Sequence, residues 1–369
     1  MTTGIFFVVT LVEALLIGGI FLLYPRFARR GLLFGVYVGE QVSAGDEAGR
    51  ITRGWYTGII VWMGLTILVS VGLWSVRPSV ALAPLAPSLL VIGFLGLYLR
   101  AYFQARALAP EGPAPPAATV LTSTPPANPI LPFTAIGFGA ACGVAALAYA
   151  ASHYADLPPL VPTHFGPSGA PDAWRPKSLG TVMLLPLMTL VLGVSLGVIA
   201  FLTSRAKRAL RYPLTEVSAA AQTRFREAMT RYISAIGMMA TLMLTLMAIS
   251  SIRVALGLER GLSPVAMITA GVLLVAALAG TVYIGLRYGQ GGARLERAAS
   301  RAQLTDGLAD NRYWVLGMFY VNRDDPAILV EHRFGLGYTL NLGNWKAVAL
   351  FVLFIGLLVG ITVAALVAK

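Results

Sequence analysis

Two histidines and two aspartates lie close together in one polar segment of an otherwise apolar chain. His153, Asp156, His164 and Asp172 fall within residues 153–178, and the whole chain has only three histidines. Imidazole nitrogens and carboxylates are ligands that zinc and similar divalent ions accept. One interpretation is therefore a metal site. The eleven-residue spacing of the two histidines matches no helical pair, and no HExxH motif or cysteine pair supports it.

A structural role for this segment is a second interpretation. Its prolines favour an extended backbone over 157–163, and Gly166 and Gly169 permit a tight reversal. Asp172 is placed to cap the helix that follows. Trp174, Arg175 and Lys177 would anchor that helix at the membrane interface, where aromatic rings and long cationic side chains are favoured. His164 would then bond to backbone carbonyls or to Asp172.

Ligand recognition is the third interpretation of residues 153–178. A stiff loop loses little conformational entropy when it binds. A cationic or amphipathic peptide would dock against Asp156, Asp172 and Phe165, with Trp174 and Lys177 beside them. Because imidazole changes charge within the physiological pH range, His164 would make such binding sensitive to pH.

Glu13 is a second candidate site. It lies inside the first apolar run, about 14 Å deep at a rise of ~1.5 Å per residue. A carboxylate at that depth costs several kcal/mol unless it is paired, protonated or hydrated. We consider two roles, a buried ion pair or hydrogen-bonded acid, with Arg253 as a partner, and a proton or ion pathway. No second acid lies deep inside another run, which weakens a proton relay.

The elements that must position these residues are membrane helices. Hydrophobic residues make up 57% of the chain and charged residues 12%. A bilayer core about 30 Å thick requires roughly 20 apolar residues per helix. Runs of that kind occur at 4–24, 55–76, 80–101, 131–152, 179–203, 232–255, 263–286 and 347–367. The sequence therefore predicts an all-α polytopic membrane protein with about eight transmembrane helices.

Basic residues predict the orientation of these helices. The first run has no basic residue before it and is followed by the basic stretch 25–30, which predicts a retained helix that ends in the cytoplasm. Alternation then places both termini outside. All but six of the 28 lysines and arginines fall on the cytoplasmic side, the exceptions being Arg77, Arg175, Lys177, Arg253, Arg260 and Lys369. The net charge of +12 thus indicates membrane lipid as a partner and not nucleic acid.

Composition suggests five consecutive regions. Residues 109–130 are rich in proline and predict a cytoplasmic linker. It separates a three-helix membrane part at 1–108 from a four-helix membrane domain at 131–287, which carries the outer loop 153–178. A cytoplasmic domain at 288–346 and a last helix at 347–369 complete the chain.

Two cytoplasmic segments are candidate partner surfaces. Residues 204–231 are basic, and their end can form an amphipathic helix, either at the membrane interface or against a partner protein. The domain 288–346 is expected to hold a helix at 294–303. The same domain contains two β-prone runs that flank the turn Asn322-Arg-Asp-Asp-Pro326. This pattern predicts a small α+β hairpin insertion before the last helix. Asn322, Asp324 and Asp325 should accept local amide hydrogens there.

Two motifs resemble those of a known family. Val161-Pro-Thr-His-Phe-Gly-Pro-Ser-Gly-Ala-Pro-Asp-Ala-Trp-Arg-Pro-Lys177 resembles the hallmark loop of a domain of unknown function in SdpI-like bacterial membrane proteins. Trp314 to Pro326 with Phe334 to Asn341 looks like a second uncharacterised domain that accompanies it. The resemblance implies the bacterial cytoplasmic membrane. The best-known member of the family gives immunity to a secreted peptide toxin and sequesters a transcriptional repressor at the membrane. The resemblance implies a similar activity for this chain.

These observations favour a binding function. No nucleophile elbow, P-loop, HExxH or paired-carboxylate signature supports an enzyme. The leading hypothesis is a protein that senses or neutralises an extracytoplasmic ligand, such as a peptide toxin, through 153–178 and signals to a cytoplasmic partner through 288–346. A transporter or channel that uses Glu13, and an accessory subunit of a larger membrane complex, are the alternatives.

Small residues predict close helix packing. Gly139 and Gly143 lie four apart in one apolar run, and Gly193 and Gly197 repeat this spacing in the next. Such pairs let helices approach closely, within one chain or between protomers. The single cysteine, Cys142, lies in the same run as the first pair and excludes an intramolecular disulfide.

Overall fold

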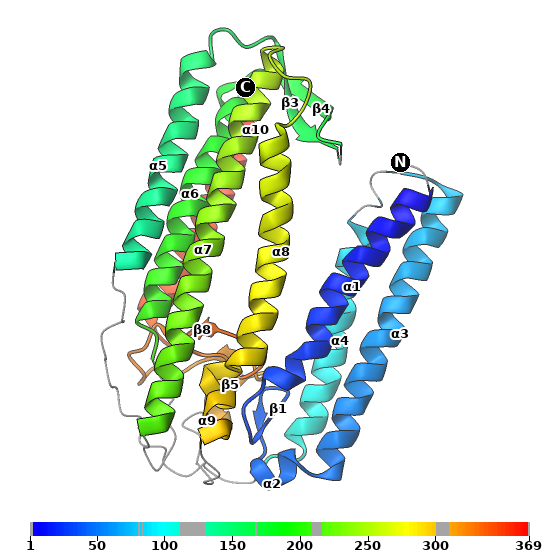
Figure 1. Cartoon of the computed structure of the whole chain (residues 1–369), viewed down its shortest axis with the longest axis vertical. Coiled ribbons are helices and arrows are strands. Elements are labelled where there is room, and N and C mark those ends of the chain that lie inside the picture. The colour runs from blue at the N-terminus through cyan, green and yellow to red at the C-terminus, as the bar shows by residue number, and fades with distance from the viewer. Residues whose placement is uncertain are drawn as a thin grey trace. The chain divides into compact units, whose positions relative to one another are not determined.

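Long helices dominate the chain (Figure 1). The computed structural model describes residues 3–79, 82, 84–110, 130–166, 168–207, 216–299 and 310–367. Within these ranges eight helices are long and apolar enough to cross a membrane. They are α1 (Thr3–Phe27), α3 (Asp46–Val76), α4 (Leu85–Arg106), α5 (Ile130–His153), α6 (Leu179–Ser204), α7 (Glu216–Ala255), α8 (Pro264–Arg287) and α10 (Trp345–Val367). The prediction of a polytopic helical membrane protein is confirmed.

Several helices extend beyond the apolar runs that predict them. α3 begins at Asp46, and α7 begins at Glu216, well before the runs expected at 55 and 232. Asp46 and Glu47 occupy the first turn of α3, where carboxylates interact favourably with the helix dipole. Polar first turns continue these helices past the apolar core, so hydropathy alone places their starts too late.

The described chain forms two compact units that do not follow the linear order of the sequence. The first combines Met1–Thr122 with Lys207–Phe225 and Thr281–Gly343. The second combines Ser123–Ala206, Arg226–Gly280 and Asn344–Lys369. Residues 310–343, the C-terminal module, therefore belong to the first unit together with the N-terminal helices.

In the first unit, α1, α3 and α4 lie side by side (Figure 1). Indole groups on α3 bond to its neighbours, because Trp55 Nε1 donates to the Phe21 carbonyl at 3.1 Å and Trp62 Nε1 to the Leu89 carbonyl at 2.8 Å. At one end of this bundle, Trp55 packs with Tyr98 and with Phe334 from the C-terminal module. This aromatic cluster joins residues that are far apart in the sequence.

In the second unit, glycines bring α5 and α6 into close contact. A Cβ atom at Gly139 would overlap the backbone of Gly193, and one at Gly143 would overlap Leu190. A Cβ at Gly197 would likewise press against Ile136 of α5. The predicted close packing therefore occurs within the chain, between α5 and α6. α10 also packs against α6.

Short antiparallel hairpins complete the described elements. β1 (Leu32–Leu33) pairs with β2 (Val36–Tyr37), and β3 (Leu160–Phe165) pairs with β4 (Pro171–Pro176). Toward the C-terminus, β5 (Trp314–Val315) pairs with β6 (Phe319–Tyr320), and β7 (Leu329–Glu331) with β8 (Tyr338–Leu340). Two short helices, α2 (Glu40–Ser43) and α9 (Ala293–Ala299), and 3₁₀ turns at Gln290–Gly292 and Asn311–Tyr313 lie between the longer elements.

The predicted hairpin insertion before the last helix is confirmed, but its strands do not pair across the turn Asn322–Pro326. Each β-prone run instead folds back on itself, so that one hairpin precedes the turn and another follows it. Leu316 and Gly317 both have positive φ and reverse the first run. Gly335 and Gly337, also at positive φ, lie where the second run reverses. The sequence interpretation overlooked these internal glycines.

Other expectations meet the limits of the described residues. The helix expected at 294–303 is α9, which is described as far as Ala299. The proline-rich linker expected at 109–130 lies outside the described residues from 111 to 129, and so do residues 208–215 of the basic segment.

Candidate functional site

His164 and Asp172 face each other across the β3–β4 hairpin. His164 Nδ1 lies 2.5 Å from Asp172 Oδ1. Both side chains are open to solvent, with exposed fractions of 63% and 44%. A carboxylate on Nδ1 favours the tautomer that carries its proton there, which leaves Nε2 as an acceptor. Asp172 is the only described residue that bonds to this ring, so Nε2 can accept a hydrogen bond or a proton from a ligand.

The local sequence explains why the pair forms. Pro162, Pro171 and Pro176 keep the two strands extended. Gly166 donates its amide to the Ala170 carbonyl at 2.8 Å, and Gly169 has φ 78°. The predictions of an extended proline-rich strand and a glycine reversal are confirmed. Register shifts on both sides of His164 turn its side chain toward Asp172.

The hairpin is tied to the ends of its neighbouring helices. The Lys177 ammonium donates to the carbonyls of Leu157 at 2.9 Å and Ala155 at 3.2 Å and lies over the Tyr154 ring. The Ser251 hydroxyl on α7 donates to the Pro162 carbonyl at 3.2 Å. Leu157 and Val161 are buried with Val182 and Ile252. Because these contacts hold the strands in place, they also fix the position of the His164–Asp172 pair.

One structural expectation for this segment is wrong. Asp172 does not cap the following helix, because Ser178 occupies the N-cap of α6 and accepts the Thr181 amide at 3.1 Å. Asp172 lies inside β4 and binds His164 instead. Lys177 binds backbone carbonyls at the base of the hairpin, so its ammonium stabilises the loop itself. A serine directly before the apolar run of α6 was the signal for the cap.

An exposed apolar and cationic surface surrounds the pair. Trp174 is 46% exposed and Leu160 is 53% exposed. Arg175 is also exposed, whereas Phe165 is half-buried. The two strands thus carry exposed aromatic, aliphatic, cationic and imidazole groups. This combination suits an amphipathic ligand better than a simple ion.

The four residues considered as metal ligands do not all come together. His153 Nδ1 lies near the Tyr149 carbonyl, at 2.9 Å, and its ring packs on the Tyr149 ring. Asp156 is exposed. Within the described ranges, no three His, Cys, Asp or Glu side chains form a group that could hold a metal ion. Only His164 and Asp172 are brought together.

Glu13 lies half-buried on α1. Among the described residues, no hydrogen-bond or ion-pair partner contacts its carboxylate. Arg253, considered as its partner, bonds through Nε to Glu259 Oε1 at 2.7 Å. Glu259 follows α7 by only a few residues, so this local pair could have been recognised from the sequence.

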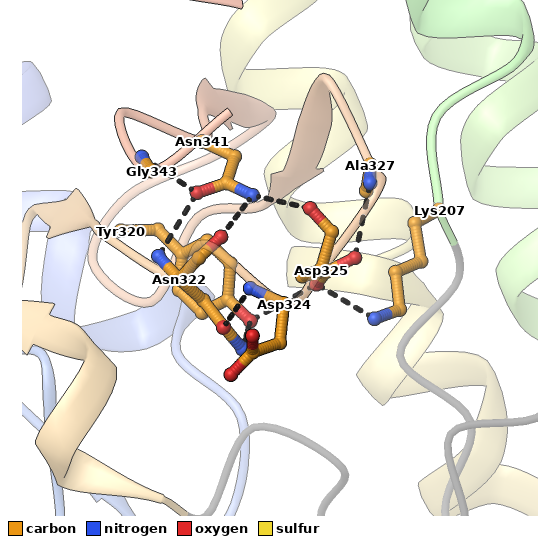
Figure 2. Close-up of polar contacts among 8 residues, drawn as sticks. All are labelled: Lys207, Tyr320, Asn322, Asp324, Asp325, Ala327, Asn341 and Gly343. Atoms are coloured by element: carbon orange, nitrogen blue, oxygen red, sulfur yellow. Dashed lines mark hydrogen bonds and ion pairs between the residues drawn. The ribbon is translucent and has the colours of Figure 1, made fainter. Parts of the chain in front are cut away.

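A buried polar network surrounds the turn after β6 (Figure 2). Asp325 Oδ2 accepts from the Lys207 ammonium at 2.7 Å and from the Tyr320 hydroxyl at 3.0 Å. The Asn341 amide nitrogen donates to the carbonyls of Asn322 and Asp325, both at 2.9 Å. Burial raises the pKa of the Tyr320 hydroxyl. With its donors and acceptors matched in this way, the network stabilises the turn and offers no open ligand site.

The local bonds expected in this turn are present. Asn322 Oδ1 accepts the Asp324 amide at 3.0 Å, and Asp325 Oδ1 accepts the Ala327 amide at 3.0 Å. Sequence reasoning missed Lys207 and Asn341 as the residues that close the network. Asn341 lies within a quoted motif, whereas nothing in the sequence marks Lys207, which lies 118 residues away from Asp325.

Glu331 at the end of β7 and Arg333 just after it bind the segment that follows α1. Arg29 and Glu331 form an ion pair whose side chains are each 1% exposed. The Arg333 guanidinium donates to Asn311 Oδ1 at 2.6 Å and to the Gly35 carbonyl at 3.3 Å, and it lies over the Trp314 ring. The sequence interpretation singled out neither arginine. These contacts explain why the C-terminal module belongs to the first unit.

The basic segment considered as a partner surface is packed in part against the chain itself. Phe225 and Arg226, near the start of α7, are buried. Phe225 faces the Tyr338 ring of β8, with the ring centroids 6.1 Å apart. Arg226 Nη1 lies 3.5 Å from the Ala206 carbonyl.

Two family matches coincide with these two regions. Residues 142–190 match a "Domain of unknown function (DUF1648)", and residues 323–348 match a "Family of unknown function (DUF5808)". The first spans the β3–β4 hairpin and the second spans β7, β8 and the turn before them. No curated protein matches the chain, and no solved structure does.

Proposed function

We propose that this chain is a receptor-like protein of the bacterial cytoplasmic membrane that binds an extracytoplasmic ligand through the β3–β4 hairpin. The observation that carries this proposal is the exposed His164–Asp172 pair on a hairpin that several contacts hold in place. A pre-ordered site loses little entropy when a ligand binds.

An amphipathic peptide is the ligand class that suits this surface. Asp172 would attract a cationic group, His164 Nε2 would accept a hydrogen bond, and Trp174 would cover an apolar side chain. The resemblance of the hairpin motif to SdpI-like proteins supports the same class, because it implies recognition of a secreted peptide toxin. Binding would neutralise the peptide or report its presence.

A cytoplasmic partner would receive the signal from the C-terminal module. In the proposed orientation, with both termini outside, this module lies in the cytoplasm. We infer that α7 transmits a conformational change caused by ligand binding. This helix contributes residues to both units, and its Ser251 binds the hairpin. Phe225 near its other end contacts Tyr338 of the module.

A binding experiment tests the proposed site. The full chain is reconstituted in nanodiscs and incubated with the secreted peptide fraction of the source bacterium, and retained peptides are identified by mass spectrometry. We expect H164A/D172A to retain at least about tenfold less of a specific peptide. E227A/R231A is the matched control, because it removes another acid–base pair from the same unit. Equal retention by both variants and the parent chain would refute the proposal.

A further inference from the structure

A cavity of about 500 Å³ lies within the first unit, beside the end of α1. Its wall begins in the last turn of α1 and continues through β1, α2 and α3. It is lined by Pro25, Arg26, Ala28, Arg29, Arg30, Leu32, Leu33, Phe34, Glu40, Ser43, Ala44, Thr52, Tyr56 and Phe334. Neither the hairpin site nor the network around Asp325 contributes to it, so its function is a separate question.

The cavity carries a surplus of positive charge. Arg26, Arg29 and Arg30 line it, and Glu40 is the acid on its wall. Arg29 is buried and paired with Glu331. Arg26 and Arg30 are exposed, and neither forms an ion pair with a described residue. These two guanidinium groups are therefore available to an anion that enters the cavity.

The hydroxyl groups on the wall narrow the choice of ligand further. The Ser43 hydroxyl donates to the Glu40 carbonyl at 2.9 Å, and the Thr52 hydroxyl donates to the Ala48 carbonyl at 2.9 Å. The hydrogens of these two hydroxyl groups are thus already bonded. The Tyr56 hydroxyl, in contrast, bonds to no described residue. The Tyr56 hydroxyl and the guanidinium groups of Arg26 and Arg30 can all donate hydrogen bonds, which suits a ligand with several acceptor oxygens.

We propose that this cavity binds the phosphate-bearing headgroup of an anionic membrane lipid. Guanidinium groups match the geometry of phosphate oxygens and bind them through paired hydrogen bonds. Pro25 and Arg26 lie in the last turn of a membrane-spanning helix, so the cavity lies where lipid headgroups are found. Leu32, Leu33 and Phe334 add apolar walls for the glycerol part. This proposal is independent of the hairpin's function.

Lipid retention by the purified full chain tests the proposal. Native mass spectrometry in detergent compares phosphatidic acid with phosphatidylcholine, and a parallel titration uses inorganic phosphate alone. We expect R26Q/R30Q to weaken phosphatidic acid binding by about tenfold or more, because each charge-assisted hydrogen bond to phosphate contributes to the free energy of binding. R53Q/R106Q is the matched control, because it removes two exposed arginines of the same unit that do not line the cavity.

Each outcome separates the possible sources of the phosphate. Selective loss of phosphatidic acid in R26Q/R30Q supports a lipid headgroup, and an equal loss of inorganic phosphate binding would show instead that the soluble anion is the ligand. Tyr56→Phe removes one hydroxyl without removing a bond to a described residue, and we expect a loss of about threefold. Equal losses in both arginine pairs, or binding that all variants retain, would overturn the proposal.

Discussion

Individual residues in this protein separate into exposed groups that can bind and buried groups that stabilise. His164 and Asp172 form a hydrogen-bonded pair at the surface, where water competes for both side chains. Arg29 and Glu331 form an ion pair that is almost entirely buried. A surface pair contributes little to stability, so the role that we propose for the His164–Asp172 contact is to orient the imidazole ring.

Substitution of Glu331 should reveal the difference. Glu331→Gln removes the charge that opposes a buried guanidinium, and we expect a loss of stability of about 3–5 kcal/mol. Thermal denaturation of the full chain in detergent measures the effect. Glu47→Gln breaks an exposed pair with Arg50 and removes one favourable helix-dipole interaction, so it should lower the midpoint far less, with a loss of stability of about 0.3–1 kcal/mol. Equal shifts in the two variants would contradict the assignment of Arg29–Glu331 as a stabilising contact.

Acid should destabilise the C-terminal module through His332. Burial lowers the pKa of His332 to about 4, and its Nδ1 accepts the Phe334 amide at 3.1 Å. The folded state therefore favours the neutral ring. The stability that this preference contributes is fully present above the ordinary imidazole pKa of about 6.5. It is lost as the pH falls from there toward 4, by at most about 1.4 kcal/mol per pH unit.

Denaturation midpoints measured from about pH 7.5 to about pH 4.5 check this expectation. His332→Gln removes the titrating group and should flatten the dependence over that window. A variant that keeps the same slope as the parent chain would show that another group is responsible.

At the scale of elements, the sequence predicted the helices well and the connections less well. Long apolar runs define membrane helices because lipid demands internal backbone bonding. The His164–Asp172 contact was also among the alternatives, because both residues flank a glycine reversal. The two hairpins after Asp310 and the bonds of Arg29, Arg333 and Lys207 were missed. The hairpins depend on local reversals at Leu316–Gly317 and Gly335–Gly337 that were overlooked. The arginine and lysine bonds join residues about 20 to 300 positions apart, and no local spacing encodes such contacts.

Close packing of α5 and α6 gives a prediction at this scale. Gly139→Ala places a methyl group against the Gly193 backbone, and overpacking of this kind costs about 1–3 kcal/mol. We expect a lower midpoint in thermal denaturation. Gly137→Ala is a matched control two residues away, where a Cβ atom would meet nothing within 4 Å. If the two variants melt alike, the α5–α6 contact is not as close as described.

At the scale of the whole molecule, the proposed function requires the hairpin and the C-terminal module to lie on opposite sides of the membrane. Cys142 is the only cysteine, so a Cys142→Ser background allows single-cysteine mapping. In intact cells, an impermeant maleimide should label Ser168→Cys beside the hairpin turn. Arg323→Cys should react only after lysis. Both positions are exposed. Labelling of Arg323→Cys in intact cells would show that the chain has the opposite orientation in the membrane.

The most direct test of ligand binding at the hairpin is photo-crosslinking in living cells. A benzoylphenylalanine replaces Trp174, which is 46% exposed beside the His164–Asp172 pair. We expect a covalent adduct with a secreted peptide on illumination, and loss of this adduct when H164A/D172A is added. Absence of any peptide adduct, or an adduct that persists in H164A/D172A, would contradict it.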